Sequence, residues 1–212
     1  MKIGLIVDGV SEYRSLNLIS ARIENGRHVI LPPLKANIQP SNPAGVIVSR
    51  CREQIANVFV VQPIDRLIVL IDLDKSNACA IVRAKELQDA FDAAKFGLKF
   101  GTYVVLKNDR FENWLVADTH SFLASKKFAL TASQAKAITG RADDVDATEL
   151  LHTAARVASG KAKRHFRYDK VSDAKVIMSA ADPYEIARNS RSFRRFLKLV
   201  GCTTYSKLAS TK

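Results

Sequence analysis

Short apolar runs and longer helical patterns alternate along the first half of the chain. Residues 3–7 and 67–71 are continuously apolar, which is typical of strands buried on both faces of a sheet. A third strand is predicted at residues 102–106, and short extended pieces are expected around residues 29–34. Helical patterns begin at Ser11 as an N-cap, near residue 43 and after residue 77. This alternation predicts an α/β fold with a mostly parallel, Rossmann-like sheet and helices on both faces.

The second half of the chain is predominantly helical in its pattern. Apolar residues recur with helical spacing at residues 111–117, 132–138, 147–158 and 190–200. We therefore expect an α/β core at residues 1–125 and a helical, basic C-terminal extension at residues 126–212 that packs on it. No stretch approaches the roughly 18 consecutive apolar residues of a membrane span. Three widely spaced cysteines argue against a zinc site or disulfides and favour a reducing, cytoplasmic location.

Positive charge is concentrated toward the C-terminus. The chain has a formal net charge of +12, and residues 161–212 hold 13 Lys/Arg against 4 Asp/Glu. Basic residues mixed with aromatic ones suit phosphate contacts and base stacking, so a nucleic-acid partner is predicted. A solvated charged surface is the commoner meaning of such runs. The candidate nucleic-acid-binding residues of this region are Lys161, Lys163, Arg164, Arg167, Arg191, Arg194 and Arg195.

Acidic residues follow the two clearest strands. Asp8 and Asp72 each come directly after an apolar run, where ligands bind in open parallel sheets. Asp74 is two residues beyond Asp72, and Glu12 is one helical turn beyond Asp8. Carboxylates gathered at one edge would repel one another unless a cation neutralises them, and Mg²⁺ prefers such oxygen ligands. The alternative is that these acids only cap helices and loops.

Lys75 follows Asp74 directly and is a candidate phosphate contact, although an exposed loop lysine is the commoner explanation. The chain has no Gly-x-Ser-x-Gly, Walker or Rossmann glycine motif, so it lacks the residues that a serine hydrolase or a P-loop nucleotide hydrolase needs.

Three motifs carry a resemblance to a known family. Residues 7–12, Val-Asp-Gly-Val-Ser-Glu, resemble the first motif of TOPRIM domains, and residues 71–74, Ile-Asp-Leu-Asp, resemble their Asp-x-Asp motif. Residues 112–118 resemble the Glu-x-Trp-Leu-x-Ala-Asp stretch of a bacterial TOPRIM-like group classed as domain of unknown function 4276, and residues 168–199 loosely fit its C-terminal part.

The resemblance implies a TOPRIM-like fold that uses Mg²⁺ (or Mn²⁺) in phosphodiester chemistry, as in topoisomerases, primases and the overcoming-lysogenisation-defect nucleases. It implies catalytic roles for Asp8, Glu12, Asp72, Asp74 and Glu112 and leaves the role of Asp118 open. It also implies a setting in anti-phage defence, with a partner protein such as an ATPase encoded nearby. The first motif has aspartate, Asp8, where the family has glutamate.

Three functions remain open from the sequence. The first is a Mg²⁺-dependent nuclease, in which metal ions activate water and stabilise the charge of the displacement. The second is a catalytically silent nucleic-acid-binding or regulatory module with the same fold. The third is a receiver-like phosphotransfer domain, which needs a lysine at a later strand end; Lys107 is in that position.

Overall fold

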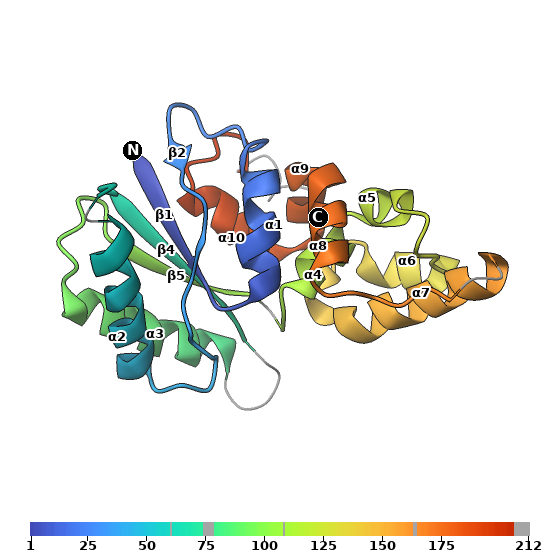
Figure 1. The fold of residues 1–212 in the computed structure, drawn as a ribbon, viewed down its shortest axis with the longest axis horizontal. Coiled ribbons are helices and arrows are strands. Elements are labelled where there is room, and N and C mark those ends of the chain that lie inside the picture. The colour runs from blue at the N-terminus through green and yellow to red at the C-terminus, as the bar shows by residue number, and fades with distance from the viewer. Residues whose placement is uncertain (60, 74–78, 108, 163–164, 206–212) are drawn as a thin grey trace.

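The computed structural model of the protein describes residues 1–59, 61–73, 79–107, 109–162 and 165–205. Its centre is a five-stranded sheet, and every pairing between the described strands is parallel. The strand order is β2-β1-β4-β5, and β3 also pairs with β1. The predicted α/β fold with a parallel sheet is therefore confirmed (Figure 1).

The strands are β1 (Lys2–Val7), β2 (Val29–Ile30), β3 (Leu34–Lys35), β4 (Arg66–Asp72) and β5 (Thr102–Lys107). The helices are α1 (Val10–Ser20), α2 (Ala44–Gln54), α3 (Ala80–Ala94), α4 (Glu112–Ala117), α5 (Thr119–Ala124), α6 (Ala132–Ile138), α7 (Ala147–Ala162), α8 (Ser172–Ala180), α9 (Pro183–Asn189) and α10 (Arg191–Leu199). A π-helical turn, η1 (Ile55–Phe59), extends α2, and a 3₁₀ turn, η2 (Ala142–Asp144), precedes α7.

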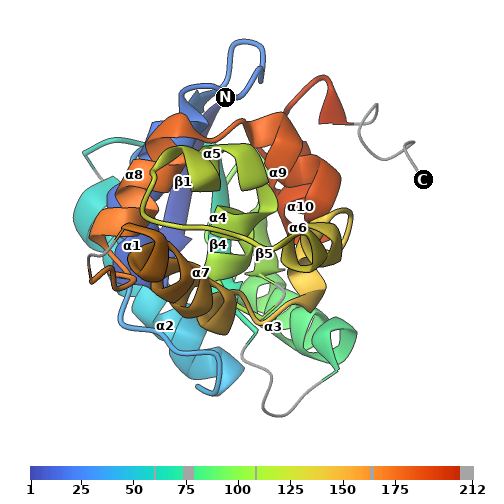
Figure 2. The same cartoon turned by 90° about the vertical axis from the view of Figure 1, so that its right-hand side faces the viewer.

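Both faces of the central strands are buried, as their continuous apolar runs predict. Successive side chains of a strand point to opposite faces. Leu5 and Leu70 belong to the core on one face, whereas Ile6 and Val69 belong to the core on the other. Helices α1 and α10 contribute to the core that contains Leu5 and Leu70, here called the first core. Helices α2 and α3 contribute to the core on the opposite face, here called the second core. The sheet is therefore the middle layer of three, as Figures 1 and 2 show.

Helices α4 to α9, here called the helical part, lie beyond the carboxyl ends of the central strands (Figure 1). Their core is continuous with the first core of the sheet, and α8 packs along α1. Trp114 of α4 is fully buried, with its ring centroid 4.8 Å from that of Phe193, and its Nε1 donates a hydrogen bond to Ser192 Oγ at 2.8 Å. Trp114 is thus a packing anchor between the helical part and α10.

Two details of the predicted helices differ from the structure. Helix α1 begins at Val10 with Gly9 as its N-cap, so the prediction that Ser11 caps this helix was wrong. Ser11 is buried, and its hydroxyl donates to the carbonyl oxygen of Lys170 at 2.9 Å, which is a tertiary contact that no local pattern reveals. Helices α5, α8 and α9 were not predicted.

Candidate metal centre

Parallel pairing of three strands places their carboxyl ends side by side. Strand β1 pairs with β4 through Val7 and Leu70, and β4 pairs with β5 through Asp72 and Lys107. Asp8 follows β1 directly, while Asp72 and Lys107 are the last residues of their strands. The first turn of α1 brings Glu12 back over the same edge. Three carboxylates and one ammonium group therefore meet where the sheet adjoins the helical part.

The ammonium group of Lys107 lies among the carboxylates of Asp8, Glu12 and Asp72, here called the acidic triad. Lys107 Nζ is 2.9 Å from Asp8 Oδ1 and 2.9 Å from Asp72 Oδ1, and it also donates a hydrogen bond to Glu12 Oε1. The contact to Asp72 is an ion pair, and Oδ1 of Asp72 has no well-oriented hydrogen bond among the described residues. The Lys107 side chain is fully buried, so its charge is held in the protein interior.

The backbone completes the arrangement of the triad. The other oxygen of Asp8, Oδ2, accepts the backbone N–H of Asp72 at 2.8 Å, which ties the ends of β1 and β4 together. The Glu12 carboxylate lies against the α-carbon of Gly9, where any Cβ would collide with it. A side chain at position 9 would therefore displace the Glu12 carboxylate from its place beside Lys107.

The pKa values of these groups follow from burial and mutual charge. Burial lowers the pKa of Lys107, but the three carboxylates around it outweigh burial and raise that pKa well above its ordinary value. Burial raises the pKa of Asp8, but the Lys107 charge and the Asp72 N–H bond leave it below the ordinary value. Burial and the charge of Asp8 raise the pKa of Glu12 despite Lys107. Burial, with the charges of Asp8 and Glu12, raises the pKa of Asp72 to about 7.

The acidic triad can hold a metal ion. One carboxylate oxygen from each residue lies within 4.8 Å of the others, and these are the hard ligands that Mg²⁺ and Mn²⁺ accept. The exposed fraction of the side chain rises from 1% for Glu12 to 6% for Asp8 and 17% for Asp72, so the site opens on the Asp72 side. With all groups ionised, one ammonium leaves two negative charges unbalanced, and a dication would balance them.

Glu112, which the resemblance assigned to the site, lies outside the acidic triad. Its side chain is buried; Oε1 accepts from the Tyr168 hydroxyl at 3.3 Å and lies 3.2 Å from Lys170 Nζ. Its other oxygen, Oε2, has no hydrogen-bond partner among the described residues. Burial, and then the Glu112 charge, raises the pKa of Tyr168. Glu112 is linked to α1 through Lys170, whose backbone carbonyl accepts a hydrogen bond from the Ser11 hydroxyl.

Asp118 has a structural set of partners. Its carboxylate accepts the backbone N–H groups of His120 and Ser121 at the start of α5 and that of Asp182 at the start of α9. The hydroxyl of Ser121 also donates to it at 2.6 Å. Asp118 therefore joins two helix N-termini.

The remaining predicted site residues, Asp74 and the basic residues, are not gathered at one place in the described part of the chain. Asp74, Lys75, Lys163 and Arg164 lie outside the described residues, as does the Lys161 side chain. Arg167 is exposed and lines a cavity beside α7. Arg191 and Arg195 are exposed on α10, which packs beside the sheet, whereas Arg194 donates to the carbonyl oxygen of Ala187 at 2.6 Å and so caps α9.

Lys107 is a residue of the site that lies outside the three sequence motifs. The sequence indicated it only for a receiver-like function, although its position directly after an apolar strand, like those of Asp8 and Asp72, can be identified in the sequence.

The comparisons with known proteins agree with the third motif. A model of one family, described as Domain of unknown function (DUF4276), matches residues 9–200. No curated protein and no solved structure matches the chain. Among the described residues, no helix combines the length and apolar character needed to cross a bilayer. The family match covers the acidic triad except Asp8, together with the helical part and α10, and on this basis the protein belongs to the DUF4276 family.

Proposed function

We propose that the protein is a TOPRIM-like nuclease that uses Mg²⁺ or Mn²⁺ to cleave nucleic-acid phosphodiesters. The observation that carries the proposal is the meeting of the acidic triad with Lys107 at the carboxyl ends of three adjacent parallel strands. This is the edge of an open parallel sheet at which ligands bind. The first two sequence motifs provide the triad residues, and the strand-end positions agree with the TOPRIM resemblance.

Each residue has a distinct task in the proposed site. Asp72 is the most accessible carboxylate and is the first to meet an incoming cation, while Asp8 and Glu12 hold it from the inner side. Lys107 keeps the three carboxylates together and offsets part of their repulsion. When bound, the metal supplies a polarised phosphate and a water of lowered pKa. A cation also favours the ionised form of Asp72, whose pKa is otherwise raised to about 7.

The residue at position 8 departs from the first TOPRIM motif that residues 7–12 resemble, in which glutamate is usual. Asp8 reaches Lys107 and the Asp72 backbone with its shorter side chain, so a ligand role is geometrically available to it. Ligation tolerates such a change better than proton transfer does, because proton transfer depends steeply on distance. We therefore give Asp8 a metal-binding role.

One variant pair tests the nuclease proposal. Asp72→Asn keeps the shape of the side chain but removes a ligand charge, so Mg²⁺- or Mn²⁺-dependent cleavage should fall roughly 100-fold or more. Asp65→Asn is the matched control, because Asp65 precedes β4 at the end opposite Asp72 and its side chain accepts the Lys2 N–H at 2.7 Å. Single-stranded DNA, duplex DNA and structured RNA are incubated with each metal, and the products are resolved by gel electrophoresis.

Cleavage that is equal in Asp72→Asn and Asp65→Asn would identify a contaminant and reject the proposal. If no substrate is cleaved with either metal, the silent binding-module function takes its place.

The contact between Lys107 and Asp72 also favours the receiver-like alternative, which needs a lysine beside a phosphorylated strand-end aspartate. In that case Asp72, the most exposed acid, would accept a phosphoryl group from acetyl phosphate in the presence of Mg²⁺. Intact-protein mass spectrometry would detect the adduct, and Asp72→Asn would abolish it. No adduct is expected if the nuclease proposal holds.

A further inference from the structure

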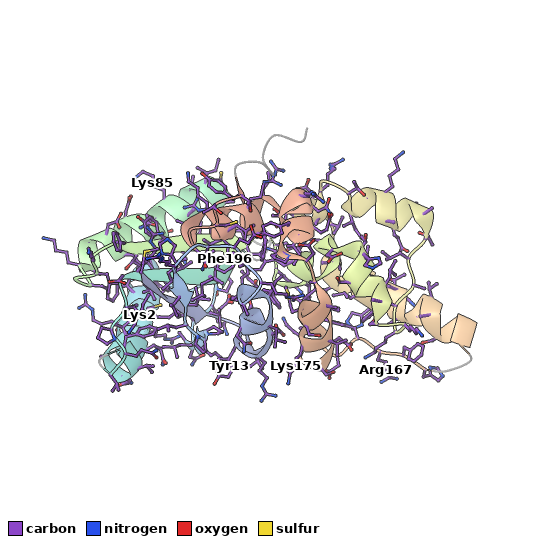
Figure 3. All side chains as sticks on the ribbon, turned by 90° about the horizontal axis from the view of Figure 1, so that it is seen from above. Lys2, Tyr13, Lys85, Arg167, Lys175 and Phe196 are labelled. Atoms are coloured by element: carbon purple, nitrogen blue, oxygen red, sulfur yellow. The ribbon has the colours of Figure 1, made fainter. Side chains whose placement is uncertain are left out.

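A second candidate site lies apart from the acidic triad, in a cavity of about 820 Å³ beside α7. Its volume falls within the range of about 300–1,000 Å³ that is usual for small-molecule sites. One wall is α7, and the other is formed by residues 165–168. The lining residues used below are His152, Arg156 and Ser159 of α7 and Phe166, Arg167 and Tyr168 of the second wall. Figure 3 shows Arg167 at the end of the molecule opposite Lys2.

The two walls of the α7 cavity are held together. Ser159 Oγ accepts the backbone N–H of Phe166 at 2.6 Å and lies 3.3 Å from the Phe166 carbonyl oxygen. The rings of His152 and Tyr168 meet edge to face with centroids 5.6 Å apart. Phe166 and Tyr168 are half-buried and pack on the core that contains Leu5, Leu70 and Trp114. The cavity is therefore preformed, and its aromatic residues come from both walls.

The charges that line the cavity are available to an anion. Arg167 is exposed and has no ion-pair partner among the described residues. Arg156 uses a single nitrogen, Nη2, for its bonds to Thr153 Oγ1 at 2.9 Å and to Glu149 Oε1 at 3.5 Å. Both partners are exposed, so that ion pair is weak and easily exchanged for a phosphate. Among the described residues that line the cavity, Glu149 is the one carboxylate.

We propose that the α7 cavity binds an unstacked nucleotide of a single-stranded nucleic acid, with the base against the aromatic residues and the flanking phosphates on Arg156 and Arg167. Single strands are bound in this way by basic grooves with aromatic platforms, whereas the bases of a duplex are stacked inside and do not reach such a wall. This inference rests on the proposed nuclease function, because it names the form of substrate that the same protein holds.

A short chain of contacts connects the cavity to the acidic triad. Tyr168 lines the cavity and donates to Glu112, and Glu112 pairs with Lys170. The carbonyl of Lys170 accepts the hydroxyl of Ser11, which precedes Glu12 in α1. These contacts link one wall of the α7 cavity to α1, the helix that carries Glu12 of the acidic triad.

Equilibrium binding of a short fluorescent oligothymidylate, followed by anisotropy in EDTA, tests the inference without turnover. The double variant Arg156→Gln/Arg167→Gln should bind roughly tenfold or more weakly, and its log–log salt slope should be smaller in magnitude by about 1.4, the value for two phosphate contacts on a single strand. His152→Ala should weaken binding roughly fivefold with an unchanged salt slope, because it removes a ring contact rather than a phosphate contact. Circular dichroism should show all variants folded, since the three residues are exposed.

Arg27→Ala is the control, because Arg27 is an exposed arginine next to β2 and is not among the described residues that line the α7 cavity. It should bind like the wild type. A duplex of the same sequence should bind more weakly, and polyphosphate should compete poorly, since it offers charge without bases.

The inference is overturned if the cavity variants bind like Arg27→Ala, or if polyphosphate competes as well as the oligonucleotide does. Failure of the nuclease proposal has another signature: binding in EDTA keeps its dependence on the α7 cavity, but no strand is cleaved when metal is added.

Discussion

Lys107 is a buried cation whose environment is set by three acids, which lie on α1, on β4 and in the turn between β1 and α1. Removing a charge from water is costly, and a buried ion pair is stable only when its partners remain in place. Burial, with the charge of neighbouring carboxylates, raises the pKa of Glu12 and of Asp72, and the three carboxylates raise the pKa of Lys107 in spite of its burial. The cluster lacks positive charge, and this deficit is the physical basis for expecting a dication.

Replacing Lys107 by methionine should therefore destabilise the protein strongly. The variant Lys107→Met keeps the length of the side chain but leaves the acidic triad without its internal cation, which should cost roughly 3–5 kcal/mol in the free energy of unfolding. For a chain of this size the melting temperature should fall by roughly 6–20 °C. Added Mn²⁺ should raise the melting temperature of the variant more than that of the wild type, because the dication replaces the missing charge.

The matched control is Lys85→Met, since Lys85 pairs with Asp89 on the exposed face of α3. This variant should melt like the wild type and respond to Mn²⁺ as the wild type does. A Lys107→Met protein that melts at the wild-type temperature would show that the buried charges do not interact as described.

At the scale of elements, Asp118 shows how one carboxylate organises several short helices. Helices α5 and α9 have six and seven residues, too few to be stable alone, so their ends depend on tertiary partners. Asp118 caps α5 and also accepts the N–H of Asp182, the residue that caps α9. Asp118 is the last residue of the third sequence motif, and these contacts give it a structural role, which the motif alone did not indicate.

The variant Asp118→Ala should separate this structural task from a role in the metal site. It removes an acceptor of several buried hydrogen bonds, so the free energy of unfolding should fall by roughly 2–4 kcal/mol. Metal affinity measured by calorimetry below the melting transition should stay at the wild-type value, because Asp118 is not part of the acidic triad.

Asp146→Ala is a control for ordinary capping: Asp146 is exposed and its Oδ1 accepts the N–H of Glu149 in α7, so a loss of about 1 kcal/mol is expected. Loss of metal binding in folded Asp118→Ala would return Asp118 to the site.

On the scale of the whole molecule, the helical part and α10 complete the core of the sheet. Leu16 and Ile19 of α1 and Val105 of β5 share one buried cluster with Met178 of α8 and Phe193 of α10. Helix α10 also packs directly on β5. The predicted boundary between residues 125 and 126 therefore divides a continuous apolar core.

A fragment of residues 1–125 should not fold cooperatively. It would expose the side of Trp114 that Phe193 and Phe196 cover, and the large apolar area left without a partner has no compensating contact. Thermal unfolding followed by near-ultraviolet circular dichroism should show no sharp transition for the fragment. Expression together with residues 126–212 should restore one, whereas a sharp transition for the fragment alone would show that residues 1–125 form an independent domain.

The local pattern of the chain determined the strands and the strand-end acids. Continuous apolar runs at β1 and β4 have few ways to be buried other than in the middle of a covered sheet. Parallel strands bring their carboxyl ends to one edge, so the convergence of Asp8 and Asp72 followed from the order of elements. The apolar stripe of α10, with Phe193 and Phe196 buried and Arg195 exposed, was predictable because apolar residues recur there with helical spacing.

Only the tertiary structure decided which polar groups became partners. Lys107 faces the acidic triad because β5 lies beside β4 in register, and strand order is not encoded by any single segment. Glu112 turned to Tyr168 and Lys170, and Ser11 bound a carbonyl 159 residues away, because the helical part folds back over α1. Apolar periodicity is a local property that a segment carries with it. The partner of a buried charge is chosen by whichever elements pack together, and that choice exists only in the folded chain.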